Sequence, residues 1–172
     1  ILEEQSLPDQ SDEMKTLREE RKAVEGALRD AFPDSSPTVR YGGSIAKGTL
    51  VRESYDLDII NYFPHDEVAA GATLKDLYLN TEAALQQAYL VERKSSALRL
   101  KSKGADTFGR DFHIDVVPGR YIDETRTDCF LYQSSGEKER LKTNFAVHIE
   151  HVKSSGVVAA IRLMKLWKAR RA

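Results

Sequence analysis

Apolar residues recur along this chain at two spacings, every three to four residues in some stretches and every second residue in others. The first spacing predicts amphipathic helices and the second predicts half-buried strands. With capping residues and Gly/Pro breaks as boundaries, helices are predicted at 11–31, 44–48, 74–89, 144–153 and 157–171. Strands are predicted at 38–41, 56–62, 97–101, 111–117 and 129–132, where Pro118-Gly119 ends the fourth.

Two of these helices carry specific expectations. Ser11 is placed to cap the first helix, whose apolar positions from Met14 to Ala31 are interrupted only by Arg21. One face of this helix therefore packs on the rest of the domain. In the last helix, Val158, Ile161 and Met164 share a face and are expected to point inward.

Composition narrows the class of protein. The chain has 172 residues, 41% hydrophobic and 31% charged, which suits one compact domain. Its single cysteine, Cys129, excludes a disulfide within the chain and is typical of a reducing, cytoplasmic compartment. The longest run without a charged residue, 83–91, is nine residues, far short of the roughly 20 that span a bilayer. The sequence thus predicts no membrane helix, and residues 1–4 show no signal-peptide pattern.

Charge is balanced overall and uneven along the chain. The net charge is −1, which gives no support for a protein that coats nucleic acid. Residues 1–34 nevertheless carry a net charge of −5, and residues 138–172 carry +7. The basic C-terminal segment can face phosphates or can be a solvated helix face, and composition alone leaves both open.

Three features in one order carry the candidate chemistry: Gly42-Gly43-Ser44, then Asp56-Leu57-Asp58, then Asp115 within 113–118. Residues two apart in a strand project from the same face, so Asp56 and Asp58 would repel each other. That placement is costly without a cation. A third carboxylate, Asp115, on a second strand completes an oxygen-only set suited to Mg²⁺ or Mn²⁺.

Such a set suits nucleotidyl transfer. Two ions about 3.5–4 Å apart can activate an attacking hydroxyl and stabilise a leaving pyrophosphate. Gly43 and Ser44, at the predicted start of a helix, would hold the triphosphate through backbone N–H groups and the Ser44 hydroxyl. Each feature alone is weak, and the Gly-Gly-Ser could be only a tight turn.

The motif order resembles the DNA polymerase beta-like nucleotidyltransferase superfamily. Residues 42–49 and 54–59, with the strand around Asp115, look like the branch of oligoadenylate synthases, cyclic GMP-AMP synthase and bacterial relatives that make cyclic oligonucleotide signals. Archaeal-type CCA-adding enzymes carry similar strings. The resemblance implies an α+β fold, a nucleotidyltransferase core with a mixed, largely antiparallel sheet flanked by helices. Asp56 and Asp58 would bind both metals, and Asp115 would orient one metal and act as general base.

The last helix extends the resemblance. Residues 161–167 look like the oligoadenylate synthase helix that supplies basic residues to the triphosphate, and this resemblance implies a phosphate-binding role for Lys165 and Arg162. The expected organisation is an N-terminal helix and linker at 1–37, a catalytic core at 38–156 and the start of a bridging helix at 157–172. Family members continue into a second helical lobe. We therefore expect an excised core that binds nucleotide poorly and turns over slowly.

Three functions are left open. The favoured one is synthesis of a cyclic or linear oligonucleotide signal from ATP, GTP or related triphosphates, with bacterial antiviral signalling as the setting that the resemblance implies. The second is nucleotidyl transfer to tRNA, a protein or a small-molecule hydroxyl. The third is a nucleotide-binding module without turnover, which the presence of all three carboxylates disfavours. An RNA acceptor or activator, the bases, the linkage and the oligomeric state also stay open.

Overall fold

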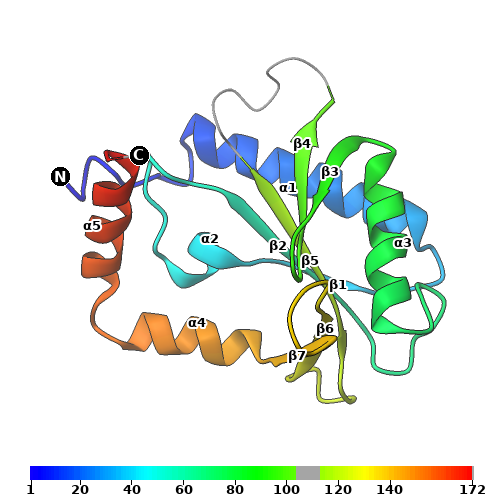
Figure 1. Cartoon of the computed structure of the whole chain (residues 1–172). Coiled ribbons are helices and arrows are strands. Elements are labelled where there is room, and N and C mark those ends of the chain that lie inside the picture. Colours follow the sequence, from blue (N-terminus) through cyan, green and yellow to red (C-terminus); the bar gives the residue numbers. More distant parts are fainter. Residues whose placement is uncertain (104–112, 172) are drawn as a thin grey trace.

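A computed structural model describes residues 1–103 and 113–171. Its seven strands form one mixed sheet, and its helices are interspersed irregularly among them along the chain (Figure 1). The five helices are α1 (Asp12–Ala31), α2 (Gly43–Lys47), α3 (Leu74–Gln86), α4 (Phe145–Ser154) and α5 (Val158–Ala169). The strands are β1 (Thr38–Tyr41), β2 (Leu57–Phe63), β3 (Tyr89–Arg93), β4 (Leu98–Ser102), β5 (Ile114–Tyr121), β6 (Cys129–Tyr132) and β7 (Arg140–Thr143). The expected α+β fold is confirmed.

The sheet order is β1-β2-β5-β4-β3, and the β6–β7 hairpin is attached to the far end of β5. The central pair, β2 and β5, is parallel, and every other named pair is antiparallel. The parallel pair therefore brings together two segments that lie far apart in the sequence. Its register sets Asp58 directly beside Asp115.

Alternation along the strands divides the sheet into two faces. One face packs against α1 and α3, and its core includes the fully buried Leu57, Ile59, Ile114 and Val116. Side chains from β2 and β5 on the opposite face pack against β6 and α4 only toward the far ends of the strands. At the beginning of the β2–β5 pair, polar side chains therefore project from this second face, while buried side chains on the first face hold the two strands in place.

The helix predictions hold with small shifts at their ends. Ser11 caps α1, since its side chain accepts a hydrogen bond from the N–H of Met14 at 3.3 Å. In α5 the expectation for Met164 is wrong, because this side chain is 70% exposed. The side of α5 that faces the domain instead contains Lys165 and the buried Leu166. Met164 precedes Lys165 by one residue, which is about 100° around the helix axis, and it faces solvent.

The strand predictions fail in three places. Residues 89–93 form β3 and residues 140–143 form β7, neither of which was expected. β5 does not end at Pro118-Gly119 but continues to Tyr121. Pro118 is tolerated because it lies between the part of β5 that pairs with β4, ending at Val116, and the part that pairs with β6. The expected beginning of this strand, 111–112, and most of the preceding turn lie outside the described residues.

Candidate active site

The carboxylates lie where β2 and β5 begin. Asp58 and Asp115 are register partners on the face opposite the α1–α3 core. Asp56 lies just before β2, and its Oδ1 accepts a hydrogen bond from the main-chain N–H of His113 at 3.2 Å. The N–H of Leu57 in turn donates to the carbonyl of His113 at 2.9 Å. The backbone ladder thus gathers all three sequence-predicted acids at one end of the parallel pair.

Asp58 is electrostatically strained in this position. Burial raises the pKa of its carboxyl, and the negative charges of Asp115 and Asp56 raise it further. The cations Lys165 and Lys47 lower the pKa of Asp58, but they do not cancel the other effects. A carboxylate with these neighbours is stabilised when further positive charge arrives, so the site is chemically suited to a divalent cation.

The Gly-Gly-Ser segment packs directly on Asp58. The N–H of Gly42 donates to the carbonyl of Asp58 at 2.7 Å. Gly43, the first residue of α2, has φ +47°, and a Cβ added there would lie 1.6 Å from Asp58 Oδ2. Only glycine fits both the backbone conformation and the space. Glycine at this position therefore lets the start of α2 lie in close contact with the Asp58 side chain.

Lys165 reaches this site from the other end of the chain. Its Nζ donates a hydrogen bond to the Ser44 hydroxyl, which joins α5 to the start of α2. Burial lowers the pKa of the Lys165 ammonium, while Asp58 and Asp56 raise it and Lys47 lowers it. A basic side chain, a hydroxyl and carboxylates therefore face the same small region.

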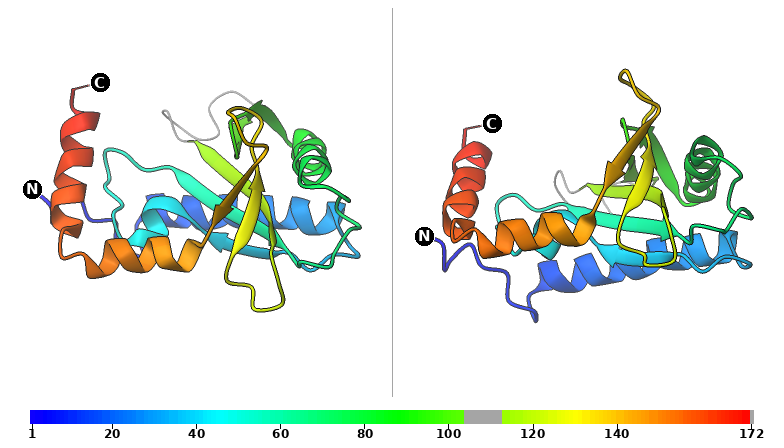
Figure 2. Two further views of the ribbon diagram at one scale, coloured as in Figure 1. Left: turned by 60° about the horizontal axis from the view of Figure 1, so that its bottom comes forward. Right: turned by 90° about the horizontal axis from the view of Figure 1, so that it is seen from below.

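Arg162 takes a different place. Its Nη2 donates to the carbonyl of Leu2 and to the hydroxyl of Ser6, both at 3.2 Å. The N-terminal segment that it contacts runs beside α5 (Figure 2). The structure thus brings Lys165 to the acids and binds Arg162 to the N-terminus, and a phosphate contact for Arg162 stays a prediction.

Sequence reasoning missed Arg99. Its Nε and Nη2 donate to Oδ1 and Oδ2 of Asp115, each at 2.8 Å, from the directly opposite position on β4. The pairing register that sets them together cannot be read from the sequence, although Arg99 does alternate with the buried Leu98 and Leu100.

Within residues 1–103 and 113–171, no three His, Cys, Asp or Glu side chains are close enough to group around a metal ion. The oxygen donors nevertheless have the right chemistry for Mg²⁺ or Mn²⁺.

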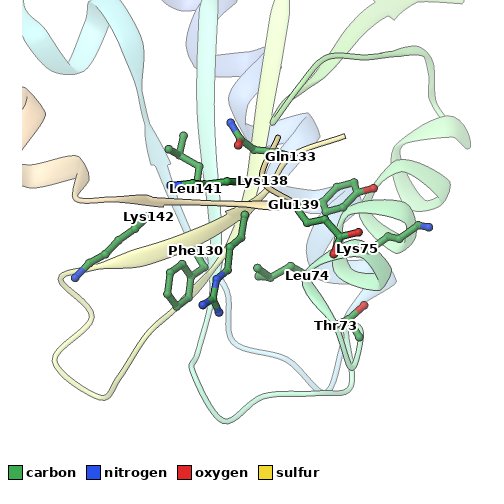
Figure 3. Close-up of a pocket in the computed structure, with 11 residues that line it drawn as sticks. Thr73, Leu74, Lys75, Phe130, Gln133, Lys138, Glu139, Leu141 and Lys142 are labelled. Atoms are coloured by element: carbon green, nitrogen blue, oxygen red, sulfur yellow. The ribbon is translucent and has the colours of Figure 1, made fainter. Parts of the chain in front are cut away.

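A separate hollow lies between the start of α3 and the β6–β7 hairpin (Figure 3). Its lining includes Leu74, Lys75, Phe130 and Arg140, and the Arg140 guanidinium lies 4.6 Å from the centroid of the Phe130 ring. None of the sequence-predicted site residues lines it. This hollow is therefore distinct from the carboxylate site.

Comparison with known proteins places the fold. No protein-family model and no curated protein matches the sequence. Among solved structures, the chain is similar to Vibrio cholerae DncV in its 3′-deoxy ATP bound form, with TM-score 0.63, 20% identity and coverage of 94% of this chain and 47% of DncV. The chain shares its fold with this bacterial protein. It is also similar to Elizabethkingia meningoseptica CdnE cyclic dinucleotide synthase with GTP and Apcpp (TM-score 0.61, 19% identity, 86% and 55% coverage).

A third similar structure is the Bradyrhizobium diazoefficiens CD-NTase CdnG in complex with GTP, with TM-score 0.61, 19% identity and coverage of 88% of this chain and 43% of CdnG. The chain spans about half the length of these proteins. In the part of the chain that the structure describes, no helix combines the length and apolar character needed to cross a membrane.

Proposed function

We propose that this chain is the catalytic half of a nucleotidyltransferase that joins nucleoside triphosphates into a cyclic or linear oligonucleotide. The observation that carries the proposal is the packing of Gly43 against Asp58, which is in register with Asp115, while Lys165 bonds to the adjacent Ser44 and its charge acts on Asp58. A glycine turn at the start of a helix and a half-buried lysine thus lie near the acids at the beginning of β2 and β5. Similar folds bind GTP or 3′-deoxy ATP in their own structures.

In this proposal the residues divide the work. Gly43, Ser44 and Lys165 hold the β and γ phosphates of the donor nucleotide. Asp115 accepts the proton of a ribose hydroxyl on the acceptor nucleotide, whose oxygen bonds to the α phosphorus of the donor. The bond between the α phosphorus and the bridging oxygen breaks, and pyrophosphate leaves. Asp56, Asp58 and Asp115 would bind two Mg²⁺ or Mn²⁺ ions, which supply charge neutralisation for the attacking and leaving oxygens.

The buried, free thiol of Cys129 and the absence of any second cysteine support a reducing, cytoplasmic location. Since the similar structures include cyclic dinucleotide synthases, we favour signalling nucleotides as products. Transfer to RNA, a protein or a small molecule is distinguished by its need for an added acceptor.

The direct test is a mass-spectrometric product profile after incubation with all four ribonucleoside triphosphates and Mg²⁺ or Mn²⁺. The wild type should form a phosphodiester-linked oligonucleotide and pyrophosphate, and Asp58→Asn should lower the rate by roughly 10³-fold or more. Asp66→Asn, at a position that is 76% exposed, is the matched control and should behave as wild type. Full activity in Asp58→Asn would refute the proposal.

Stability of Asp58→Asn separates a catalytic from a structural role. Because the pKa of Asp58 is raised in the folded state, the native protein binds this proton more tightly than the unfolded chain does. Wild-type stability is therefore lost as pH rises from about 4, the ordinary pKa of Asp, through the folded pKa. Asp58→Asn should melt at or above the wild-type temperature, and the difference should grow over this range. A lower melting temperature at neutral pH would indicate a structural role.

A further inference from the structure

Arg99 occupies a charged row that crosses the sheet at the carboxylate site. Cross-strand partners run from Glu92 on β3 to Arg99 on β4, Asp115 on β5 and Asp58 on β2. Directly opposite residues share one face, so the four side chains form a continuous line. Its charges are negative, positive, negative and negative. Arg99 is thus the cation placed next to the acids within the sheet itself.

Arg99 and Asp115 form a bidentate salt bridge, in which two guanidinium nitrogens bond to the two carboxylate oxygens. Arg99 donates from Nε to Oδ1 and from Nη2 to Oδ2, each at 2.8 Å, and the two side chains are 27% and 18% exposed. This parallel pair of charge-assisted bonds is the strongest common geometry between arginine and a carboxylate. Glu92, the other neighbour of Arg99 in the row, instead forms ion pairs with Lys94 and Lys101. Every hydrogen bond of the Arg99 side chain in the described part of the chain goes to Asp115.

Asp58 and Asp115 consequently have different surroundings, although they are register partners. Asp115 has a guanidinium on both oxygens, whereas Asp58 lies near two other carboxylates and near the charges of Lys165 and Lys47 without a hydrogen bond to either lysine among those found in the described residues. A divalent cation that is to be shared by the two acids must compete with Arg99 for the oxygens of Asp115. It also meets the repulsion of a fixed positive charge.

We propose that Arg99 is a positioning residue that holds Asp115 as an internal counter-ion and so lowers the affinity of the nucleotide-free protein for divalent cations. This inference rests on the proposed function, since it assigns a cation role to Asp115. The triphosphate brings negative charge that offsets Arg99. Full cation binding is then coupled to the arrival of nucleotide, and the empty site does not fill with metal on its own.

The test is Mn²⁺ binding without nucleotide, followed by the electron paramagnetic resonance signal of free Mn²⁺. Arg99→Gln removes the charge but keeps an amide that can donate to Asp115. It should bind Mn²⁺ about tenfold more tightly, since a neighbouring arginine lowers the proton affinity of a carboxylate by about one to three orders of magnitude and acts on a metal cation in the same direction. Arg99→Lys keeps the charge and should stay within about threefold of wild type. Arg93→Gln is the matched control, because Arg93 forms the same two-bond pair with Glu82 away from the acids.

A double-mutant cycle with Asp115→Asn isolates the pair. The gain from Arg99→Gln should vanish in the Asp115→Asn background. Unchanged or weaker Mn²⁺ binding by a folded Arg99→Gln protein would overturn the inference. If that variant fails to fold, Mn²⁺ binding by Arg99→Lys that is more than about threefold tighter than wild type would also overturn it. If the wild type makes product while Arg99→Gln binds Mn²⁺ as wild type, only this inference falls. If no variant binds Mn²⁺, the cation site itself falls as well.

Discussion

The acids and Lys165 belong to regions that are held in place by different means. Asp58 and Asp115 project from β2 and β5, whose other face contributes fully buried Leu57, Ile59 and Ile114 to the core. α5 buries only Leu166, and Leu163, Met164 and Trp167 on it are exposed. Packing therefore fixes the acids, while α5 depends more on polar contacts for its position.

Those polar contacts go to three places: the start of α2, the N-terminal segment and the segment that precedes β2. Lys165 bonds to Ser44, and Arg162 bonds to the N-terminal residues Leu2 and Ser6. Arg170 forms a two-bond pair with Glu53, at 2.8 and 2.7 Å, in the segment that precedes β2. Exposed ion pairs and hydrogen bonds each contribute roughly 1 kcal/mol or less. Hence α5 can change position at small cost, and the sheet cannot.

The largest effect on activity is expected at Gly43, where the start of α2 packs most closely on Asp58. Gly43→Ala forces a left-handed backbone on alanine and places its Cβ against Asp58, so either α2 or the acid must move. A displacement of about 1 Å at a catalytic group can cost 10²-fold in rate, and we expect a loss of that order in oligonucleotide synthesis. The strain should also lower stability by about 1–2 kcal/mol.

Gly26→Ala is the control for this substitution. Gly26 lies within α1, and a Cβ there meets nothing within 4 Å. The change should raise stability by about 1 kcal/mol, as alanine does in helix interiors, and leave the rate as in wild type. Equal rates for the Gly43→Ala and Gly26→Ala proteins would show that the turn does not set the position of Asp58.

A smaller effect is expected at the lysine of the helical region. Lys165→Met removes a charged group that would contact phosphate, and such bonds contribute about 1.5–3 kcal/mol. The KM for nucleoside triphosphate should rise roughly 10- to 100-fold. The melting temperature should change little, because the loss of the bond to Ser44 is offset by the removal of a partly desolvated charge. Lys168→Met, an exposed neighbour on α5, is the control. Equal KM values for the two variants would exclude Lys165 from nucleotide binding.

The same contrast explains how far the sequence could be read. The sequence predicted the strand that contains Leu57 and Ile59 and the side of the sheet on which Asp58 projects. It could do so because a half-buried strand alternates apolar and polar residues. Pairing register leaves no such pattern, so Arg99 went unnoticed opposite Asp115. The strands β3 and β7 were missed because their residues are mostly exposed and carry little apolar alternation.

The last helix shows the limit most clearly. Arg162 and Lys165 are three residues apart, so the spacing put both on one helix face, and the resemblance to oligoadenylate synthases gave both a phosphate-binding role. The 100° step per residue separates them by about 60° around the axis, and the N-terminal segment lies within reach of one of them. A contact between residues 160 positions apart is not a local property of either segment.

The smallest effect should come from breaking this N-terminal contact. Arg162→Ala removes two hydrogen bonds to the segment, which costs about 1 kcal/mol of stability and lets α5 shift. Lys165 would then be less well placed, and the KM for nucleoside triphosphate should rise only a few-fold, with little change in kcat. Deleting residues 1–4 together with Ser6→Ala removes the same partners but keeps Gln5, which bonds to Glu53, and should reproduce these values. Combining this deletion with Arg162→Ala should add nothing further. A large KM increase in Arg162→Ala that the deletion does not reproduce would instead show that Arg162 contacts the triphosphate directly, and the division between a packed sheet and a polar-tethered helix would then no longer explain its role.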